Sequence, residues 1–338
     1  RPNVGQILRV DPVVTNRTTV SWTVTFDQPV TGVTPSNFVV TGASVSYSGI
    51  SVIGSGSVWT VTLSGVSGNG GLQLSLGANY GSIVNVGNEA IPSTRRDGES
   101  YVIDQTRPTA TITRMSSSPT NASSTAWDIV FNESVTGLTA ANFTPNVTGT
   151  VTFTPGVVIT GSGSTWRATI NGVAGQGEIA VALNTNLGSI TDAATNQFNA
   201  AVTSPSYVID RVDPQLVSIV RVGTQIRKDP TLQWTVTFSE AVDGVTPGNF
   251  SPSETGVSGA EVTTAVQAAN PAVWTITVST GSGTGSLGLN LLANQTSIKD
   301  SVGNPLNPSA VAGPAFTIDR AAPTTNASFN QNWSKDPV

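Results

Sequence analysis

One alternating stretch, built around a tryptophan, occurs three times in this chain. Each copy runs from the tryptophan through an apolar alternation to Phe, and then into a Val-x-Gly loop. The tryptophans, Trp22, Trp127 and Trp234, are 105 and 107 residues apart. Since a period of about 100 residues is the usual size of a domain, the repeat predicts tandem copies of one folding unit.

The stretch itself has the pattern of a half-buried strand. Val20, Trp22, Val24 and Phe26 alternate with Ser21, Thr23 and Thr25. A period of two places the apolar side chains on one face of an antiparallel sheet. Each repeat has about seven such strands with Gly turns between them and no helical periodicity, which predicts an all-β fold of tandem immunoglobulin-like β-sandwich domains.

The aromatic residues are predicted to form the cores. The chain has no cysteine, so two tryptophans per repeat must fill each sandwich in place of a disulfide. The repeated aromatics are Trp22, Trp127, Trp234; Trp59, Trp166, Trp274; Phe26, Phe131, Phe238; Phe38, Phe143, Phe250; and Tyr101, Tyr207, Phe316. The alternative, a sugar-binding platform, is left to the unrepeated loop residues Tyr80 and Phe198, with Phe329 and Trp333 near the C-terminal end.

The repeat also predicts domain boundaries. Arg1-Pro2 matches Arg107-Pro108, and Ala322-Pro323 opens a further copy. We expect Ig-like domains at 1–106, 107–212 and 213–321, and the start of a fourth repeat at 322–338. Short linkers that end before Pro are stiff, so the domains are expected to form an extended rod of about 100 Å. The register at both ends predicts that the chain is a piece of a longer protein.

Composition excludes several classes of function. Charged residues make up 10% of the chain and the net charge is −5, so there is no basic stripe for nucleic acid. No apolar run approaches the ~18 residues of a membrane-spanning segment. The chain lacks His and Cys, the commonest general base and the thiol nucleophile, and we therefore expect no enzyme.

Carboxylates recur at the ends of the repeats and in the turn before the last strand: Asp104, Asp210 and Asp319; Asp192 and Asp300. Calcium takes six to eight oxygen ligands, which Asp, Asn and backbone carbonyls at a domain junction can supply. Calcium at the junctions is thus one hypothesis, with no cofactor otherwise required. The other is that each Asp caps backbone N–H groups. Glu133 and Glu240 are interpreted as solvated loop residues, because Gln28 occupies their position in the first repeat.

The string Phe238-Ser239-Glu240-Ala241-Val242-Asp243-Gly244, followed by Asn249-Phe250, resembles the bacterial Ig-like repeats found in tandem in large exported surface proteins and adhesins. The turn from Asp300 to Asn304 matches the D-x-x-G-N turn of that family, whereas Asp192–Asn196 departs at the Gly.

This resemblance implies an extracellular or bacterial cell-surface location and a structural or adhesive role. The domains would form a stiff spacer or a building block of a surface filament, sheath or surface layer. The alternative is a carbohydrate-binding or accessory module of an exported protein. The expected partners are other copies of the chain, other surface proteins or glycans.

Overall fold

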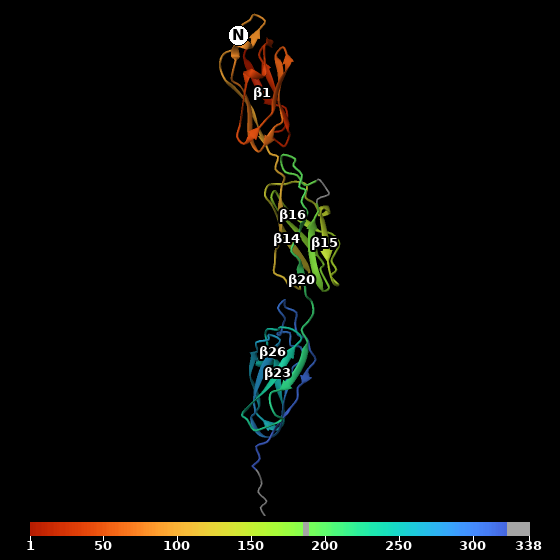
Figure 1. Ribbon diagram of the computed structural model, residues 1–338. Coiled ribbons are helices and arrows are strands. Elements are labelled where there is room, and N and C mark those ends of the chain that lie inside the picture. Colours follow the sequence, from red (N-terminus) through yellow and green to blue (C-terminus); the bar gives the residue numbers. More distant parts are fainter. Residues whose placement is uncertain (185–188, 323–338) are drawn as a thin grey trace, which may run out of the picture. The chain divides into compact units, whose positions relative to one another are not determined.

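The protein is described by a computed structural model, which covers residues 1–184 and 189–322 (Figure 1). The chain forms two compact units, Arg1–Ser118 with Ala122–Ile209, and Pro119–Asn121 with the chain from Asp210 onward. The first unit contains two β-sandwiches and the second contains one. The predicted fourth repeat lies outside the described residues, apart from residue 322. Across the described ranges, no helix is long and apolar enough to span a membrane.

The first sandwich consists of two four-stranded sheets, β1-β3-β8-β7 and β2-β12-β10-β5. Its strands pair antiparallel, except that the short β2 runs parallel to β12. Its elements are β1 (Val4–Arg9), β2 (Val14–Thr15), β3 (Thr19–Phe26), β4 (Val30–Thr31), the 3-10 turn η1 (Pro35–Asn37), β5 (Phe38–Gly42), β6 (Val45–Ser46), β7 (Gly49–Ser55), β8 (Val58–Ser64), β9 (Ser67–Gly68), β10 (Gly70–Leu76), η2 (Tyr80–Ser82), β11 (Val84–Asn85) and β12 (Arg96–Ile103).

The second sandwich repeats this arrangement. One sheet has the order β13-β14-β17-β16, and in the facing sheet β18 pairs with β15, β19 and β20 (Figure 1). Its elements are β13 (Ala110–Arg114), β14 (Ser124–Phe131), η3 (Ala140–Asn142), β15 (Phe143–Val147), β16 (Val158–Ser162), β17 (Thr165–Asn171), β18 (Gly177–Leu183), β19 (Val202–Thr203) and β20 (Tyr207–Ile209).

The third sandwich has the sheets β21-β23-β26-β25 and β22-β29-β27-β24, with β28 also paired to β27. Its elements are β21 (Leu216–Arg221), β22 (Ile226–Arg227), β23 (Thr231–Phe238), η4 (Pro247–Asn249), β24 (Phe250–Ser258), β25 (Glu261–Gln267), β26 (Val273–Ser279), β27 (Ser282–Leu291), β28 (Val311–Ala312) and β29 (Phe316–Ile318). The predicted all-β, immunoglobulin-like fold is confirmed. The rod and the domain boundaries stay predictions.

The tryptophan of the repeated stretch lies at the centre of each core. Trp22, Trp127 and Trp234 are fully buried. Their Nε1–H groups donate to backbone carbonyls of the facing sheet or of the loop before it, Glu99, Pro205 and Pro314, at 2.7, 2.8 and 2.8 Å. Each indole meets an aromatic ring edge-on, with ring centroids 4.9 to 5.2 Å apart. Aromatic packing and one satisfied N–H therefore join the two sheets without a disulfide.

The second repeated tryptophan fills the cores only in part. Trp59 and Trp166 are half-buried, and their Nε1–H groups donate to the carbonyls of Gly56 and Gly163 in the preceding hairpin turn. Trp274 is 9% exposed. The expectation of two core tryptophans per sandwich is thus right for the third sandwich. It is only partly right for the first and second, where Trp59 and Trp166 pack against the core but bend over their own hairpin.

The two unrepeated aromatic candidates lie on the cores. Phe198 is buried and packs edge-on against Phe131, with ring centroids 5.5 Å apart. Tyr80 is partly buried against the first core. Within the described ranges, Tyr47 is the only aromatic side chain that is exposed, at 41%. The other two candidates, Phe329 and Trp333, lie outside the described residues.

Thr125 is a buried hydroxyl in the second core. It is 2% exposed and its Oγ1 has no hydrogen-bond partner among the described residues, whereas Val20 and Leu232 occupy the same position in the other sandwiches. An unpaired buried hydroxyl costs about 1–3 kcal/mol. Thr125→Val is therefore expected to raise the free energy of unfolding of the second sandwich by about 1–2 kcal/mol, as measured by denaturant titration. The reverse change, Val20→Thr, is the control and should destabilise the first sandwich. A loss of stability in Thr125→Val would contradict the conclusion that the Thr125 hydroxyl is buried without a hydrogen-bond partner.

Candidate metal centre

Two clusters of three carboxylates occur in the described residues. In the first triad, Asp104, Glu133 and Asp192 each place one oxygen within 4.8 Å of the others. In the second triad, Asp210, Glu240 and Asp300 do the same. The first acid of each triad follows the last strand of one sandwich, β12 or β20, and the glutamate follows the tryptophan strand, β14 or β23. The structure thus brings together four of the five predicted Asp residues, in pairs, and adds a glutamate to each pair.

The Asp residues that follow a last strand are held by their own backbone. One oxygen of Asp104, Asp210 and Asp319 accepts the N–H of the residue two positions on, at 3.0, 3.2 and 3.0 Å. The capping hypothesis therefore holds for one oxygen of each carboxylate. Asp319 joins no carboxylate cluster within the described residues.

Asp192 is positioned by an asparagine in its own turn. Asp192 is 5% exposed, and its two oxygens accept the backbone N–H and the side-chain Nδ2 of Asn196, both at 2.8 Å. The Asn196 Nδ2 also donates to the carbonyl of Asp104 at 2.8 Å, and its Oδ1 accepts from the Nδ2 of Asn16 at 3.1 Å. This pair of asparagines ties the turn of the second sandwich to the first sandwich.

The second triad has the same support. Asp300 accepts the backbone N–H of Asn304 at 2.9 Å and its Nδ2 at 2.8 Å. The Asn304 Nδ2 donates to the carbonyl of Asp210 at 3.1 Å, and its Oδ1 accepts from the Nδ2 of Asn121 at 3.0 Å. The same residue types therefore have the same roles in both triads.

The turn that carries Asp192 and Asp300, and the matching turn of the first sandwich, each contain one residue with a left-handed backbone. This residue is Asn88 in the first sandwich (φ 57°), Thr195 in the second (φ 71°) and Gly303 in the third (φ 96°). Glycine adopts this region without cost and asparagine does so readily, whereas a β-branched residue is strained there. The departure at Thr195 that the sequence showed is thus accommodated without changing the turn.

Charge accumulates in both triads. Burial, followed by the neighbouring charges of Asp192 and Asp104, raises the pKa of Glu133 above its usual 4.5. Burial, followed by Asp300 and Asp210, raises the pKa of Glu240 in the same way. Over residues 1–184 and 189–322, no Lys or Arg forms an ion pair with a carboxylate of the first triad. Its negative charge therefore calls for a proton or a bound cation.

In the first sandwich, amide side chains stand at the positions of the triad's Glu and second Asp. Gln28 and Asn85 stand where Glu133 and Asp192 stand in the second sandwich, and the Asn85 Nδ2 donates to the Gln28 Oε1 at 3.2 Å. An amide pair supplies its own donor, which a carboxylate pair cannot do. The Asn85 Nδ2 also donates to the Glu89 Oε2 at 3.0 Å, so the amides of the first sandwich satisfy the one carboxylate beside them. Glu133 and Glu240 lie in loops and are partly exposed, as interpreted, and each also faces two aspartates.

The donor set fits a hard cation. Three carboxylates provide up to six oxygens, and calcium accepts six to eight, with water completing the shell. Zinc sites use Cys or His, which the chain lacks. Asp104, Glu133 and Asp192 would hold one ion, and Asp210, Glu240 and Asp300 another.

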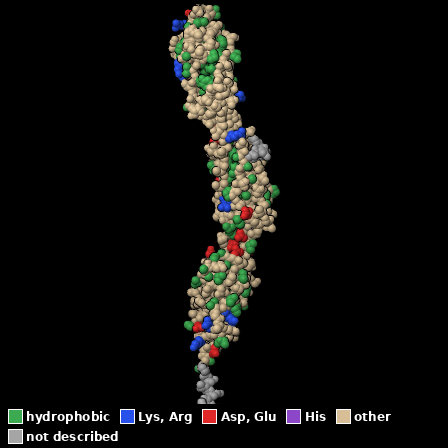
Figure 2. Space-filling model, viewed as in Figure 1, with side chains coloured by type: hydrophobic (Ala, Val, Ile, Leu, Met, Phe, Trp, Pro, Cys, Tyr) green, Lys and Arg blue, Asp and Glu red, His purple; other side chains and the backbone are tan. Residues whose placement is uncertain are grey.

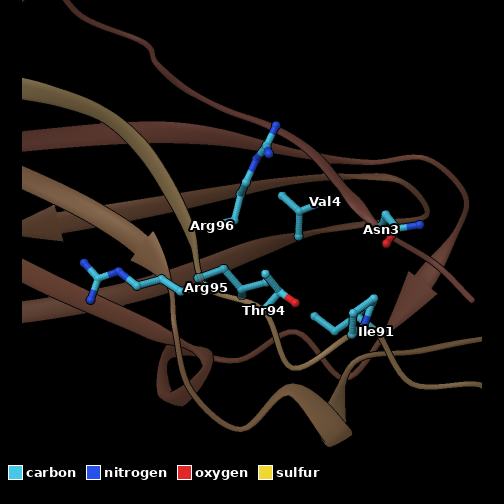
Figure 3. A pocket seen from close by; sticks show the side chains of 8 residues that line it. Asn3, Val4, Ile91, Thr94, Arg95 and Arg96 are labelled. Carbon is cyan, nitrogen blue, oxygen red and sulfur yellow. The ribbon is translucent and has the colours of Figure 1, made fainter.

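Elsewhere the surface offers little chemistry. Most of the face seen in Figure 2 is neither charged nor hydrophobic. A hollow of about 140 Å³ lies at the start of β1 (Figure 3). Val4, Thr94 and Ile91 turn toward it, whereas Arg95 and Arg96 extend away. The two guanidinium groups donate to Asp97 and Ser75, and to the carbonyl of Gly5, so this hollow is not an anion site.

Comparison with known proteins gives a family for part of the chain. Residues 104–209 match the family model described as a bacterial Ig-like domain. The resemblance that the sequence suggested is thus confirmed for this range. No curated protein matches the chain in sequence.

Several solved structures are similar in fold. The Escherichia coli adhesin FdeC is 15% identical, with 94% of this chain and 98% of that chain covered and a TM-score of 0.43. InvD of Yersinia pseudotuberculosis is 12% identical, with 95% and 86% covered and a TM-score of 0.32. Invasin, a bacterial integrin-binding protein, is 11% identical, with 86% of this chain and 56% of that chain covered and a TM-score of 0.30. The chain thus spans about half the length of the invasin structure.

Proposed function

We propose, on the premise that residues 104–209 are a bacterial Ig-like domain, that this chain is a non-catalytic structural or adhesive segment of a bacterial cell-surface or extracellular protein. In this role the sandwiches form a stiff spacer or a building block of a surface assembly. The observation that carries the proposal is a polar cluster that occurs twice: an Asp that follows a last strand, a Glu–Asp pair and two asparagines.

The linker after the first sandwich supports stiffness. The backbone N–H of Gln105 donates to the Oδ1 of Asn69 at 2.6 Å, and the Nδ2 of Asn69 donates to the Thr106 hydroxyl at 2.9 Å. The Gln105 side chain donates to the carbonyls of Asn16 and Val66 at 3.3 and 3.1 Å. A linker whose polar groups are bound to the preceding domain has little freedom to bend.

We further propose that calcium occupies the two triads. An ion held by Asp104, Glu133 and Asp192 would add a charged tie between the end of the first sandwich and two loops of the second. Since both triads have the same donors, both would bind calcium over the same range of concentration.

The spacer role is tested by a distance measurement within the first unit. The chain has no cysteine, so Ser55→Cys and Ser162→Cys introduce two unique spin labels, one in each sandwich. We expect a narrow distribution of label distances. Asn196→Ala should broaden it because both contacts to the first sandwich are lost, whereas Asn146→Ala, on an exposed edge strand, should not. A broad distribution in the unmodified background would contradict a stiff spacer.

A further inference from the structure

The edge strands of the three sandwiches differ in a way that bears on association. The edges of the sheets include β1, β5 and β7 in the first sandwich, β13, β15 and β16 in the second, and β21, β24 and β25 in the third. Of these, β1, β13 and β21 each end in an arginine, and β5 has only five residues. An edge strand exposes unpaired N–H and C=O groups, and proteins protect such edges with proline, charge, bulges or short strands.

The second and third sandwiches carry these protections. Pro145 lies in β15 and Pro252 in β24. In the third sandwich, β25 begins at Glu261 and its register with β26 shifts between Val262 and Thr264. In the second sandwich, β16 has only five residues.

The β7 edge of the first sandwich has no proline, charge or bulge, and the strand is not short. Its seven residues, Gly49–Ser55, contain no proline and no charge. Its register with β8 runs unbroken from Gly49↔Ser64 to Ser55↔Val58. On its outer face Ile53 is 75% exposed, and Val58 on the neighbouring strand is 49% exposed. This edge is regular and uncharged, and it exposes an isoleucine.

We propose that β7 is a self-association edge, which pairs antiparallel with β7 of a second copy of this chain. Two identical strands that pair antiparallel are related by a two-fold axis, so one surface complements itself. The chain carries a net charge of −5, and none of its charged residues lies in β7. The uncharged β7 edge lets two copies approach without like-charge repulsion, and Ile53 then covers apolar surface of the partner.

The contact is expected to be weak in isolation. Stable interfaces bury about 1,200–2,000 Å² in total, more than a single seven-residue strand pair provides. Association through β7 should therefore appear at high protein concentration, or where several copies are held side by side.

Disulfide capture provides the first test. Ser51→Cys, Ile53→Cys and Ser55→Cys each add one thiol along the outer face of β7 to a chain without cysteine. At least one of them, the nearest to the two-fold axis, should form a covalent dimer under mild oxidation. The matched control is Val266→Cys, which stands at the same place on β25 and is 57% exposed. Yields no higher than in this control would overturn the proposal.

Sedimentation over a concentration series provides the second test. Ile53→Lys places two like charges at the contact and should abolish the concentration-dependent dimer, whereas Val266→Lys should not. Ile53 is outside the core, so circular dichroism should show both variants folded. A dimer that survives Ile53→Lys, or a protein that stays monomeric throughout, would refute pairing through β7. Ser55, one of the spin-label sites, lies in β7, so the spin-label experiment is run at low protein concentration, where β7 pairing is not expected and the distances are those within single chains.

Discussion

Trp127→Ala is expected to unfold the second sandwich. Trp127 is fully buried, stacks edge-on against Tyr207 at 5.2 Å and donates to the Pro205 carbonyl at 2.8 Å. Truncating a core tryptophan costs about 3–5 kcal/mol, and the orphaned carbonyl adds about 1–3 kcal/mol. Domains of this size have about 5–15 kcal/mol of stability in total, so the loss removes most or all of it.

Limited proteolysis combined with denaturant titration measures this effect. New cleavage should appear within the second sandwich, while the first sandwich, which has its own core around Trp22, stays resistant. Trp166→Ala is the matched control, because that indole is only half-buried and should cost clearly less. Equal losses of stability in Trp127→Ala and Trp166→Ala would contradict the assignment of Trp127 to the centre of the core.

Calcium is expected to stabilise the protein through both triads. A ligand at about 100 times its dissociation constant adds about 2.7 kcal/mol to the free energy of unfolding. Titrating calcium into protein freed of metal by a chelator should release or absorb heat and raise the melting temperature. Glu133→Gln and Glu240→Gln should each remove one part of the response, since each takes a charge from one triad.

The first sandwich provides the control for this prediction. Gln28→Ala alters the amide pair that stands where the triads have acids, and it should leave the response to calcium unchanged. No heat and no gain in melting temperature, or a gain that persists in the double variant Glu133→Gln with Glu240→Gln, would eliminate the triads as calcium sites.

The raised pKa of Glu133 also determines whether the stability of the protein rises or falls with pH. The pKa of Glu133 is raised above 4.5 by burial and by Asp192 and Asp104. Without calcium, its contribution to stability is present while the carboxyl is protonated, below its ordinary pKa, and is lost as pH rises through the raised value. The stabilisation by calcium has the opposite pH dependence. It increases as pH rises through the same range, because the ion binds the ionised carboxylate. Glutamine does not titrate, so Glu133→Gln should reduce the slope of both curves, and the double variant with Glu240→Gln should flatten them.

The sequence was sufficient to predict the fold of the sandwiches. The alternation of Val20, Trp22, Val24 and Phe26 assigned the buried face of β3, and all four side chains are in the core. Such a prediction works because strand burial depends on a local period of two. The second tryptophan was predicted less well: Trp59 lies on the correct strand, but the hairpin beside it decided how much of its indole stays exposed.

The triads depended on tertiary structure. Asp104, Glu133 and Asp192 lie on three loops, 29 and 59 residues apart along the chain, and no local period relates them. Aspartates at strand ends could be read from the repeat, but the meeting of Asp104 with Glu133 and Asp192 required knowledge of how the end of one sandwich contacts the loops of the next.

The sequence by itself thus determined three disulfide-free sandwiches with a buried tryptophan at the centre of each, because the pattern that buries a strand is written along a few neighbouring residues. Only the tertiary structure decided that the strand-end carboxylates form two triads and that β7 is a seven-residue edge strand without proline or charge. Both depend on which loops and edges share space, and that is set by long-range packing.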